Sequence, residues 1–98
     1  MSLEADSFEV LNNEAASRFE AGSGDKLVFL NYRYRKSDLV LVHTEVPPEL
    51  GGHGLGGKLV RAALDFARSR NVKVIPLCPF VSGYIDKHLE YQDLVASK

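Results

Sequence analysis

The sequence of 98 residues contains one cysteine, Cys78, so no disulfide can form within the chain. Its three histidines, His43, His53 and His88, are widely separated, and no cysteine–histidine cluster has the spacing of a zinc site. These absences predict a protein without a structural disulfide and without a bound metal ion.

Other classes of protein are excluded by what the chain lacks. No apolar run approaches the roughly 20 residues of a membrane-spanning helix. The first ten residues, MSLEADSFEV, lack the basic segment and apolar core of a signal peptide. A net charge of −1 gives no electrostatic footprint for nucleic acid or an anionic membrane. We therefore expect a cytoplasmic protein in a reducing compartment, with no nucleic acid and no membrane among its partners.

The remaining composition is that of a soluble globular chain, with 45% hydrophobic and 26% charged residues. No repeat, low-complexity tract or linker divides it. We expect residues 1–98 to form a single domain, near the lower size limit for burying a core without disulfides or metals.

The N-terminal half is rich in strand-forming residues. A short strand is predicted at 6–11 and another at Arg18–Ala21, followed by a turn-forming Gly-Ser-Gly-Asp. Residues 26–35 and 38–46 predict a hairpin of two long strands joined at Lys36-Ser37. Simple alternation along the second strand predicts two faces. One face would carry Val40, Val42, Thr44 and Val46, and the other Leu39, Leu41, His43 and Glu45.

The C-terminal half changes to helical periodicity. Apolar residues recur at helical spacing from 54 to 70, with Leu55, Leu59, Ala63 and Phe66 in one stripe. Residues 72–77 predict a short strand that Pro76 should end or splay. Residues 80–91 predict a second helix, and the tail a final short strand.

The order of elements is therefore β-β-β-α-β-α. It predicts an α+β fold with a mostly antiparallel twisted sheet and a βαβα C-terminal half.

The loop that precedes the first helix is unusually rich in glycine, with Gly51, Gly52, Gly54, Gly56 and Gly57 inside seven residues. Glycines allow a backbone to approach a ligand closely, and a helix N-terminus offers unpaired amides to an anion. The alternative is a flexible turn without a ligand, which would be an entropically costly way to build one turn.

Two familiar phosphate-loop patterns match the loop but fail downstream. Gly52 to Gly57 satisfies G-x-G-x-x-G, yet the following strand region, VIPLCPF, lacks the acidic residue of a dinucleotide site. Gly52 to Lys58 satisfies G-x-x-x-x-G-K, but Leu59 stands where a magnesium-binding hydroxyl is required. Neither a Rossmann nor a Walker A site is therefore predicted.

A third pattern, Gln/Arg-x-x-Gly-x-Gly/Ala, matches at Gly54 and Gly56, with Gly51 in the Gln/Arg position. Here the sequence resembles the GNAT (Gcn5-related N-acetyltransferase) superfamily. It is most similar to the compact single-domain proteins with HTEVP, G-x-G, P-x-C-x-F, YI and H-x-EY in that order. The matching segments are 43–47, 52–56, 76–80 and 84–91, and the resemblance covers about residues 27–95.

The resemblance implies a GNAT-like fold and acetyl-CoA as the bound coenzyme. The coenzyme A pyrophosphate would lie on the backbone amides of the glycine loop. The pantetheine arm would pair with the backbone of Glu45 and Val46, between the two splayed strands. The full set of predicted coenzyme-binding residues is Glu45, Val46, Gly51, Gly52, His53, Gly54, Leu55, Gly56, Gly57, Lys58, Cys78, Phe80, Tyr84 and Lys87.

Acetyl transfer from a thioester to an amine needs a base for the amine and a proton for the departing thiolate. Cys78 is a candidate acyl carrier or proton donor, with a buried structural thiol as the alternative. His43 and Glu45 are candidate general bases, or else simply polar surface residues. By resemblance Tyr84 is a candidate proton donor; core packing is the alternative.

Two functions of different classes follow. The first is an acetyl-CoA-dependent N-acyltransferase that acts on an unidentified amine by direct transfer, with a covalent Cys78 route as a variant. The second is a coenzyme A binding or sensing module with little catalysis, acting through a protein partner. A monomer or weak homodimer is expected.

Overall fold

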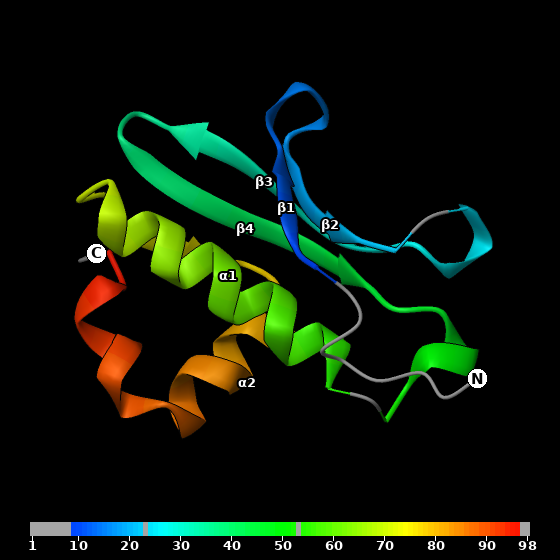
Figure 1. The fold of residues 1–98 in the computed structure, drawn as a ribbon. Coiled ribbons are helices and arrows are strands. Elements are labelled where there is room, and N and C mark those ends of the chain that lie inside the picture. The colour runs from blue at the N-terminus through cyan, green and yellow to red at the C-terminus, as the bar shows by residue number, and fades with distance from the viewer. Residues whose placement is uncertain (1–8, 23, 53, 97–98) are drawn as a thin grey trace.

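The computed structural model describes residues 9–22, 24–52 and 54–96. The described chain forms an α+β fold around one five-stranded sheet, as predicted (Figure 1). Its strands and α-helices are β1 (Leu11–Asn13), β2 (Arg18–Ala21), β3 (Val28–Arg35), β4 (Asp38–Glu45), α1 (Leu55–Ser69), β5 (Val74–Pro76) and α2 (Pro79–Lys87).

The strands lie in the sheet in their sequence order. Strands β1 to β4 are antiparallel neighbours, because short turns connect each to the next. Strand β5 is parallel to β4, so the chain must cross over between them, and α1 makes that crossover. The predicted α+β fold, with a mostly antiparallel sheet and a βαβα continuation, is therefore confirmed, but four strands precede α1 where the predicted order had three.

The N-terminal strand lies later in the chain than predicted. Strand β1 covers Leu11–Asn13, not 6–11, and residues 1–8 are outside the described residues. The Asn13 side chain accepts a hydrogen bond from the Ala16 amide, and Ser17 adopts a left-handed φ of 53°. This tight connection sets the register of β1 on β2, which the weak strand propensity of asparagine did not indicate.

A β-bulge interrupts β4 at Val42 and corrects the predicted faces of this strand. The register runs from Asn31↔His43 to Tyr32↔Leu41, so Val42 has no partner on β3. One extra residue shifts the alternation by one position. Thr44, not His43, therefore shares a face with Leu41, while His43 and Glu45 lie on the opposite face.

Helix α1 buries the predicted apolar stripe. Leu55, Leu59 and Ala63 are buried, and Phe66 is half-buried against the same core. The helix ends where Asn71 takes a left-handed φ of 58° and the Val72 amide donates to the Ala67 carbonyl. That C-terminal arrangement satisfies carbonyls that the last turn would otherwise leave unpaired.

The second helix is shorter than predicted and the tail forms no strand. Helix α2 ends at Lys87, and residues Leu89–Leu94 form a 3-10 helix. The tail makes a single parallel bridge, Val74↔Val95. Pairing cannot extend along β5, because the next residue facing that edge is Pro76, which has no amide hydrogen.

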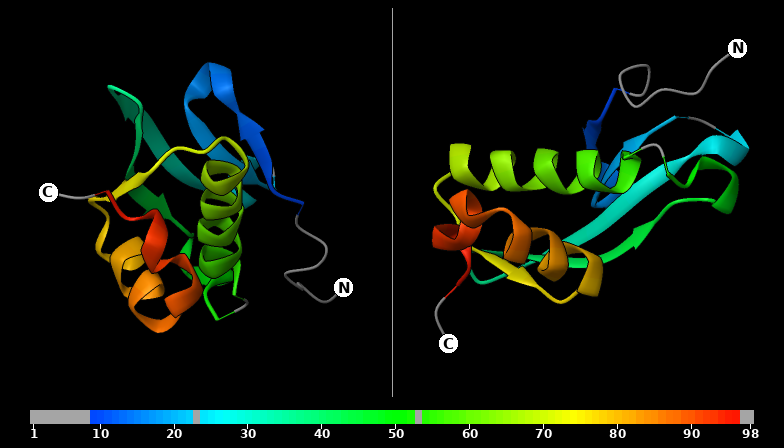
Figure 2. Two further views of the ribbon diagram at one scale, coloured as in Figure 1. Left: turned by 90° about the vertical axis from the view of Figure 1, so that its left-hand side faces the viewer. Right: turned by 90° about the horizontal axis from the view of Figure 1, so that it is seen from below.

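Both α-helices lie on one face of the sheet (Figure 2). Their apolar side chains join those of β2, β3 and β4 in one core cluster, with Leu30, Leu41, Leu64 and Val81 among its fully buried members. Neither α1 nor α2 covers the opposite face, where Arg33, His43 and Glu45 are exposed. The sheet thus has a covered face and an open one.

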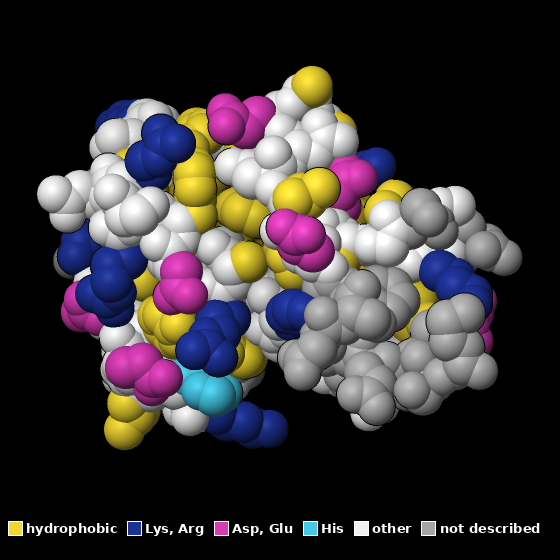
Figure 3. Space-filling model, viewed as in Figure 1, with side chains coloured by type: hydrophobic (Ala, Val, Ile, Leu, Met, Phe, Trp, Pro, Cys, Tyr) yellow, Lys and Arg dark blue, Asp and Glu magenta, His cyan; other side chains and the backbone are white. Residues whose placement is uncertain are grey.

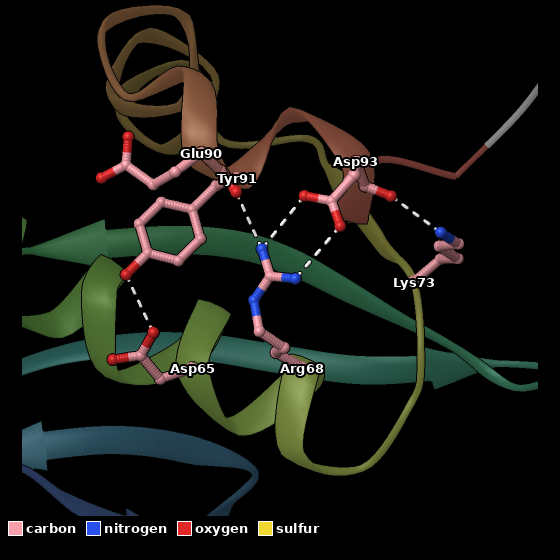
Figure 4. Close-up of polar contacts among 6 residues, drawn as sticks. All are labelled: Asp65, Arg68, Lys73, Glu90, Tyr91 and Asp93. Carbon is pink, nitrogen blue, oxygen red and sulfur yellow. Dashed lines mark hydrogen bonds and ion pairs between the residues drawn. The ribbon is translucent and has the colours of Figure 1, made fainter.

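Polar contacts fasten the C-terminal segment to α1 and to Lys73, just before β5 (Figure 4). The Arg68 guanidinium donates to both carboxylate oxygens of Asp93, at 3.0 and 3.1 Å, and to the Glu90 carbonyl at 2.8 Å. Tyr91 donates to Asp65 at 2.8 Å, and the Lys73 ammonium donates to the Asp93 carbonyl at 2.7 Å. These contacts hold the 3-10 helix against α1.

We expect the Asp93 contribution to stability to depend on pH. The Arg68 hydrogen bonds lower the pKa of the Asp93 carboxyl, so its stabilisation is present above the ordinary aspartate pKa and is lost as pH falls through the lowered value. Asp93→Asn should therefore reduce the melting temperature at neutral pH, and the difference from wild type should shrink in acid below about pH 4. Thermal melts across this range measure it. Asp86 is exposed on α2. If Asp86→Asn changed the melting temperature as much as Asp93→Asn does, the effect could not be assigned to the Arg68–Asp93 contact.

Candidate functional site

Strands β4 and β5 separate halfway along β4. Their pairing ends at Leu41↔Pro76, and the amides of Leu77 and Cys78 both donate to the Leu41 carbonyl at 3.1 Å. The chain then leaves the sheet, because α2 begins at Pro79. Beyond Leu41, the bulged Val42 has no register partner, and within the described residues His43, Thr44 and Glu45 pair only with β3. The predicted splay is present, and it leaves an unpaired edge of β4 beside the start of α2.

Cys78 lies at this split, at the N-terminal end of α2. Its Sγ is 3.4 Å from the Thr44 hydroxyl, and only 5% of the residue is exposed. Burial raises the pKa of the Cys78 thiol, but the Thr44 hydroxyl and the backbone amides of Val81, Phe80 and Thr44 together lower it below its ordinary value. The thiol therefore stands in an environment that stabilises its anion.

The glycine loop joins this split to α1. Gly52 and Gly54 have φ values of +83° and +74°, which side chains other than glycine rarely adopt, and open space surrounds both. Leu50 is fully buried and fastens the loop to the core. The chain entering the loop is thus anchored in the core at Leu50, whereas the backbone at Gly52 and Gly54 has open space beside it.

The start of α1 has the polarity of an anion site. The first intrahelical bond runs from the Lys58 amide to the Gly54 carbonyl, so the amides of the preceding turn have no intrahelical partner. The helix begins without a side-chain cap and without an acidic residue in its first turn, where Lys58 lies instead. No carboxylate of the helix's own first turn therefore compensates the positive end of the helix dipole.

Two of the loop glycines have a packing role that the sequence did not indicate. A Cβ on Gly56 would lie 2.7 Å from Cζ of Phe80, and one on Gly57 would lie 3.4 Å from Cε2 of Tyr84. Phe80 and Tyr84 stand one turn apart on α2, so both rings lie over the first turn of α1. The absence of a side chain at Gly56 is therefore needed for this close approach of the two helices, whereas a Cβ at Gly57 would make an ordinary van der Waals contact with Tyr84.

His43 and Glu45 form a pair on the open face of the sheet. Nε2 of His43 is 2.9 Å from Oε1 of Glu45, and both side chains are more than half exposed. The His43 ring also meets Phe29 edge-on, with 6.5 Å between centroids. The structure therefore brings these two candidates together, but on the face of β4 opposite to Thr44 and Cys78.

Tyr84 lies apart from Cys78. It follows Cys78 by six residues, about 9 Å along a helix axis at 1.5 Å per residue. Its ring stacks on His88 at 4.0 Å, and burial raises the pKa of its hydroxyl, which keeps the proton at neutral pH. Lys87 is exposed in the last turn of α2.

The surface around these helices has no dominant charge. Basic and acidic side chains alternate over α1 and α2 on the face shown in Figure 3. His53 lies outside the described residues, so its predicted role stays a prediction. Across the described ranges, no group of three or more His, Cys, Asp or Glu side chains is arranged to hold a metal ion. No helix within them has the length and apolarity needed to cross a membrane.

A family model and a solved structure show which family the chain belongs to. The family model described as GCN5-related N-acetyl-transferase matches residues 18–94. The solution structure of a GCN5-like protein from Staphylococcus aureus superposes with a TM-score of 0.73 at 32% identity, covering 92% of this chain and 89% of that one. The chain belongs to the GCN5-related N-acetyltransferase family.

Curated relatives include the proteins named NATD1. The Xenopus tropicalis protein is 31% identical over 67 residues, which is 68% of this chain and 62% of that protein. The mouse protein is 33% identical over 67 residues, covering 68% and 61% of the two chains. The chain thus spans about three fifths of the length of these relatives.

The packing role of Gly56 predicts different effects for two neighbouring substitutions. Gly57→Ala should stabilise the protein by about 0.5 kcal/mol through reduced backbone entropy of the unfolded chain. Gly56→Ala should stabilise the protein by less than this, or destabilise it, because the added Cβ would displace the Phe80 ring. Chemical denaturation measures both. In a Phe80→Ala background the two substitutions should change the free energy of unfolding by the same amount. If they still differ, the Phe80 contact is not the cause of the difference.

The hydroxyl of Thr44 should lower the pKa of Cys78 measurably. Thr44→Val removes one hydrogen bond to the thiolate, so the Cys78 pKa should rise, whereas Thr44→Ser should leave it near the wild-type value. The single cysteine makes the thiolate absorbance in the ultraviolet an unambiguous reporter of titration. An unchanged midpoint in Thr44→Val would assign the effect to the backbone amides alone.

Proposed function

We propose that the protein is an acetyl-CoA-dependent N-acyltransferase that acts on an amine. The observation that carries the proposal is the split between β4 and β5. Beside it lie an unpaired edge of β4 and the hydrogen-bonded thiol of Cys78, and Phe80 of α2 reaches Gly56 at the N-terminus of α1. Family membership supports coenzyme A as the ligand of this split.

The chain's own groups fit the parts of coenzyme A. The unpaired edge of β4 at Thr44 and Glu45, with Val46 just beyond the strand, can pair with the amides of a pantetheine arm as an added strand would. The open, left-handed positions at Gly52 and Gly54 admit a pyrophosphate close to the backbone. The amides at the start of α1, with Lys58 in the same turn, supply the positive potential that an anion requires.

Bound acetyl-CoA would supply the thioester from which the acyl group is transferred to the amine, with release of the coenzyme A thiolate. His43, hydrogen-bonded to Glu45, would take the proton of an amine that arrives from the open face. Cys78 stands at the split where a thiolate needs a proton, while Tyr84 keeps its proton but stands farther along α2. We therefore propose that the acyl group passes directly to the amine and that Cys78 donates the proton to the departing thiolate. Tyr84 instead packs against Gly57.

Binding is tested by titrating acetyl-CoA into wild type, Gly54→Ala and the matched control Gly83→Ala. An alanine at the left-handed Gly54 position is strained by about 1–2 kcal/mol. The free loop of this variant should therefore leave the left-handed conformation, and binding would have to restore it. We expect affinity about five- to thirtyfold weaker. Gly83 has neither positive φ nor a neighbour within 4 Å, so its variant should bind normally. Equal affinities for all three proteins would remove the loop from the site.

Turnover is then measured as free coenzyme A thiol released with polyamines, lysine peptides and peptides with free N-termini. Under direct transfer, Cys78→Ala should still turn over, at a reduced rate. Complete loss of turnover with acetyl-CoA binding retained would instead favour a covalent route through Cys78. Binding without turnover on any amine would favour the coenzyme A binding module.

A further inference from the structure

A cavity of about 650 Å³ lies along the outer edge of β5, away from the glycine loop. Its volume falls within the roughly 300–1,000 Å³ of ordinary ligand sites. Ile75 and Leu77 belong to its floor, and Ser82 of α2 and Val95 of the tail border it. Leu77 is 55% exposed there, which is unusual for a leucine at the end of a core strand.

The edge of β5 offers this cavity little backbone pairing. The carbonyl of Val74 already accepts the Ala96 amide at 2.9 Å. Pro76, the next residue facing outward, has no amide hydrogen to donate. An occupant is therefore recognised mainly by its side chains and end groups, through apolar contact with Leu77 and by charge.

Charge is concentrated at the end of the cavity that lies farther from Cys78. Arg35 and Lys36, at the tip of the β3–β4 hairpin, are exposed cations that line it. Asp38, partly buried, is the one acidic side chain among the lining residues. This end is thus net positive. At the other end the lining residues Ile75 and Leu77 are apolar, and the Leu77 amide donates to the Leu41 carbonyl at the split between β4 and β5.

The register gives the length of the cavity. Arg35 pairs with Asp38, and Leu41, whose carbonyl accepts the Cys78 amide, lies three residues farther along β4. At about 3.3 Å per residue, the basic end is about 10 Å from the split. An extended peptide covers that span with three residues.

From these observations we infer that the cavity is the acceptor groove, and that the acceptor is an extended peptide with a free α-amine. The amine reaches the split near Cys78, and an acidic side chain at the fourth residue lies against Arg35 and Lys36. The inference rests on the proposed acetyl transfer, for which it specifies the class of acceptor.

The test compares two short peptides of glycine and alanine that differ only in their fourth residue, aspartate or lysine. We expect kcat/KM to be about tenfold higher for the aspartate peptide, the effect of one favourable charge-assisted contact, and to lose this preference at high salt. The double variant Arg35→Glu/Lys36→Glu should prefer the lysine peptide. Arg33→Glu is the matched control, because Arg33 is exposed on the same strand but does not line the cavity.

Direct binding separates this inference from the proposed function. Amide chemical shifts of Ile75, Leu77 and Ser82 are followed by NMR as each peptide is added, whether or not any amine is acetylated. Shifts caused by the aspartate peptide and abolished in the double variant would support the groove. No shifts, or equal shifts with both peptides, would overturn it even if other amines are acetylated. A dimer that dissociates in the double variant would also overturn it, by making a second copy the occupant.

Discussion

The architecture depends on one interaction, in which the carbonyl of Leu41 accepts the amides of both Leu77 and Cys78. Up to this point β5 continues the sheet; beyond it the chain turns into α2, and β4 continues alone. The last four residues of β4 are thereby left with an edge that no strand of the described chain pairs with. An unpaired strand edge can pair with a ligand's amide groups as an added strand would, and this edge carries the proposed site.

The bulge at Val42 places the candidate catalytic residues on two different faces of β4. Because it shifts the alternation by one residue, Thr44 meets Cys78 on the covered face while His43 meets Glu45 on the open one. In the proposed reaction, the candidate proton acceptor His43 and the candidate proton donor Cys78 would therefore lie on opposite sides of β4.

The small size of the protein is offset by close helix packing and by a fastened C-terminus. Phe80 and Tyr84 lie over Gly56 and Gly57, so α2 can approach the first turn of α1. The Arg68–Asp93 pair and the Tyr91–Asp65 hydrogen bond hold the 3-10 helix against α1. Both helices lie on one face of the sheet (Figure 2), and on its other face the side chains of Arg33, His43 and Glu45 are exposed.

Local pattern in the sequence determined the hairpin, the apolar stripe of α1, the crossover to β5 and the splay at Pro76, since each rests on periodicity or backbone chemistry within a few residues. The ordered motifs around the glycines also indicated the family. Only the tertiary structure decided the faces of β4, the packing role of Gly56 and the length of α2. A bulge is a property of two paired strands, and a close helix contact depends on a residue that lies 24 positions away in the sequence. Neither leaves a mark on local periodicity, because both arise from where distant segments meet.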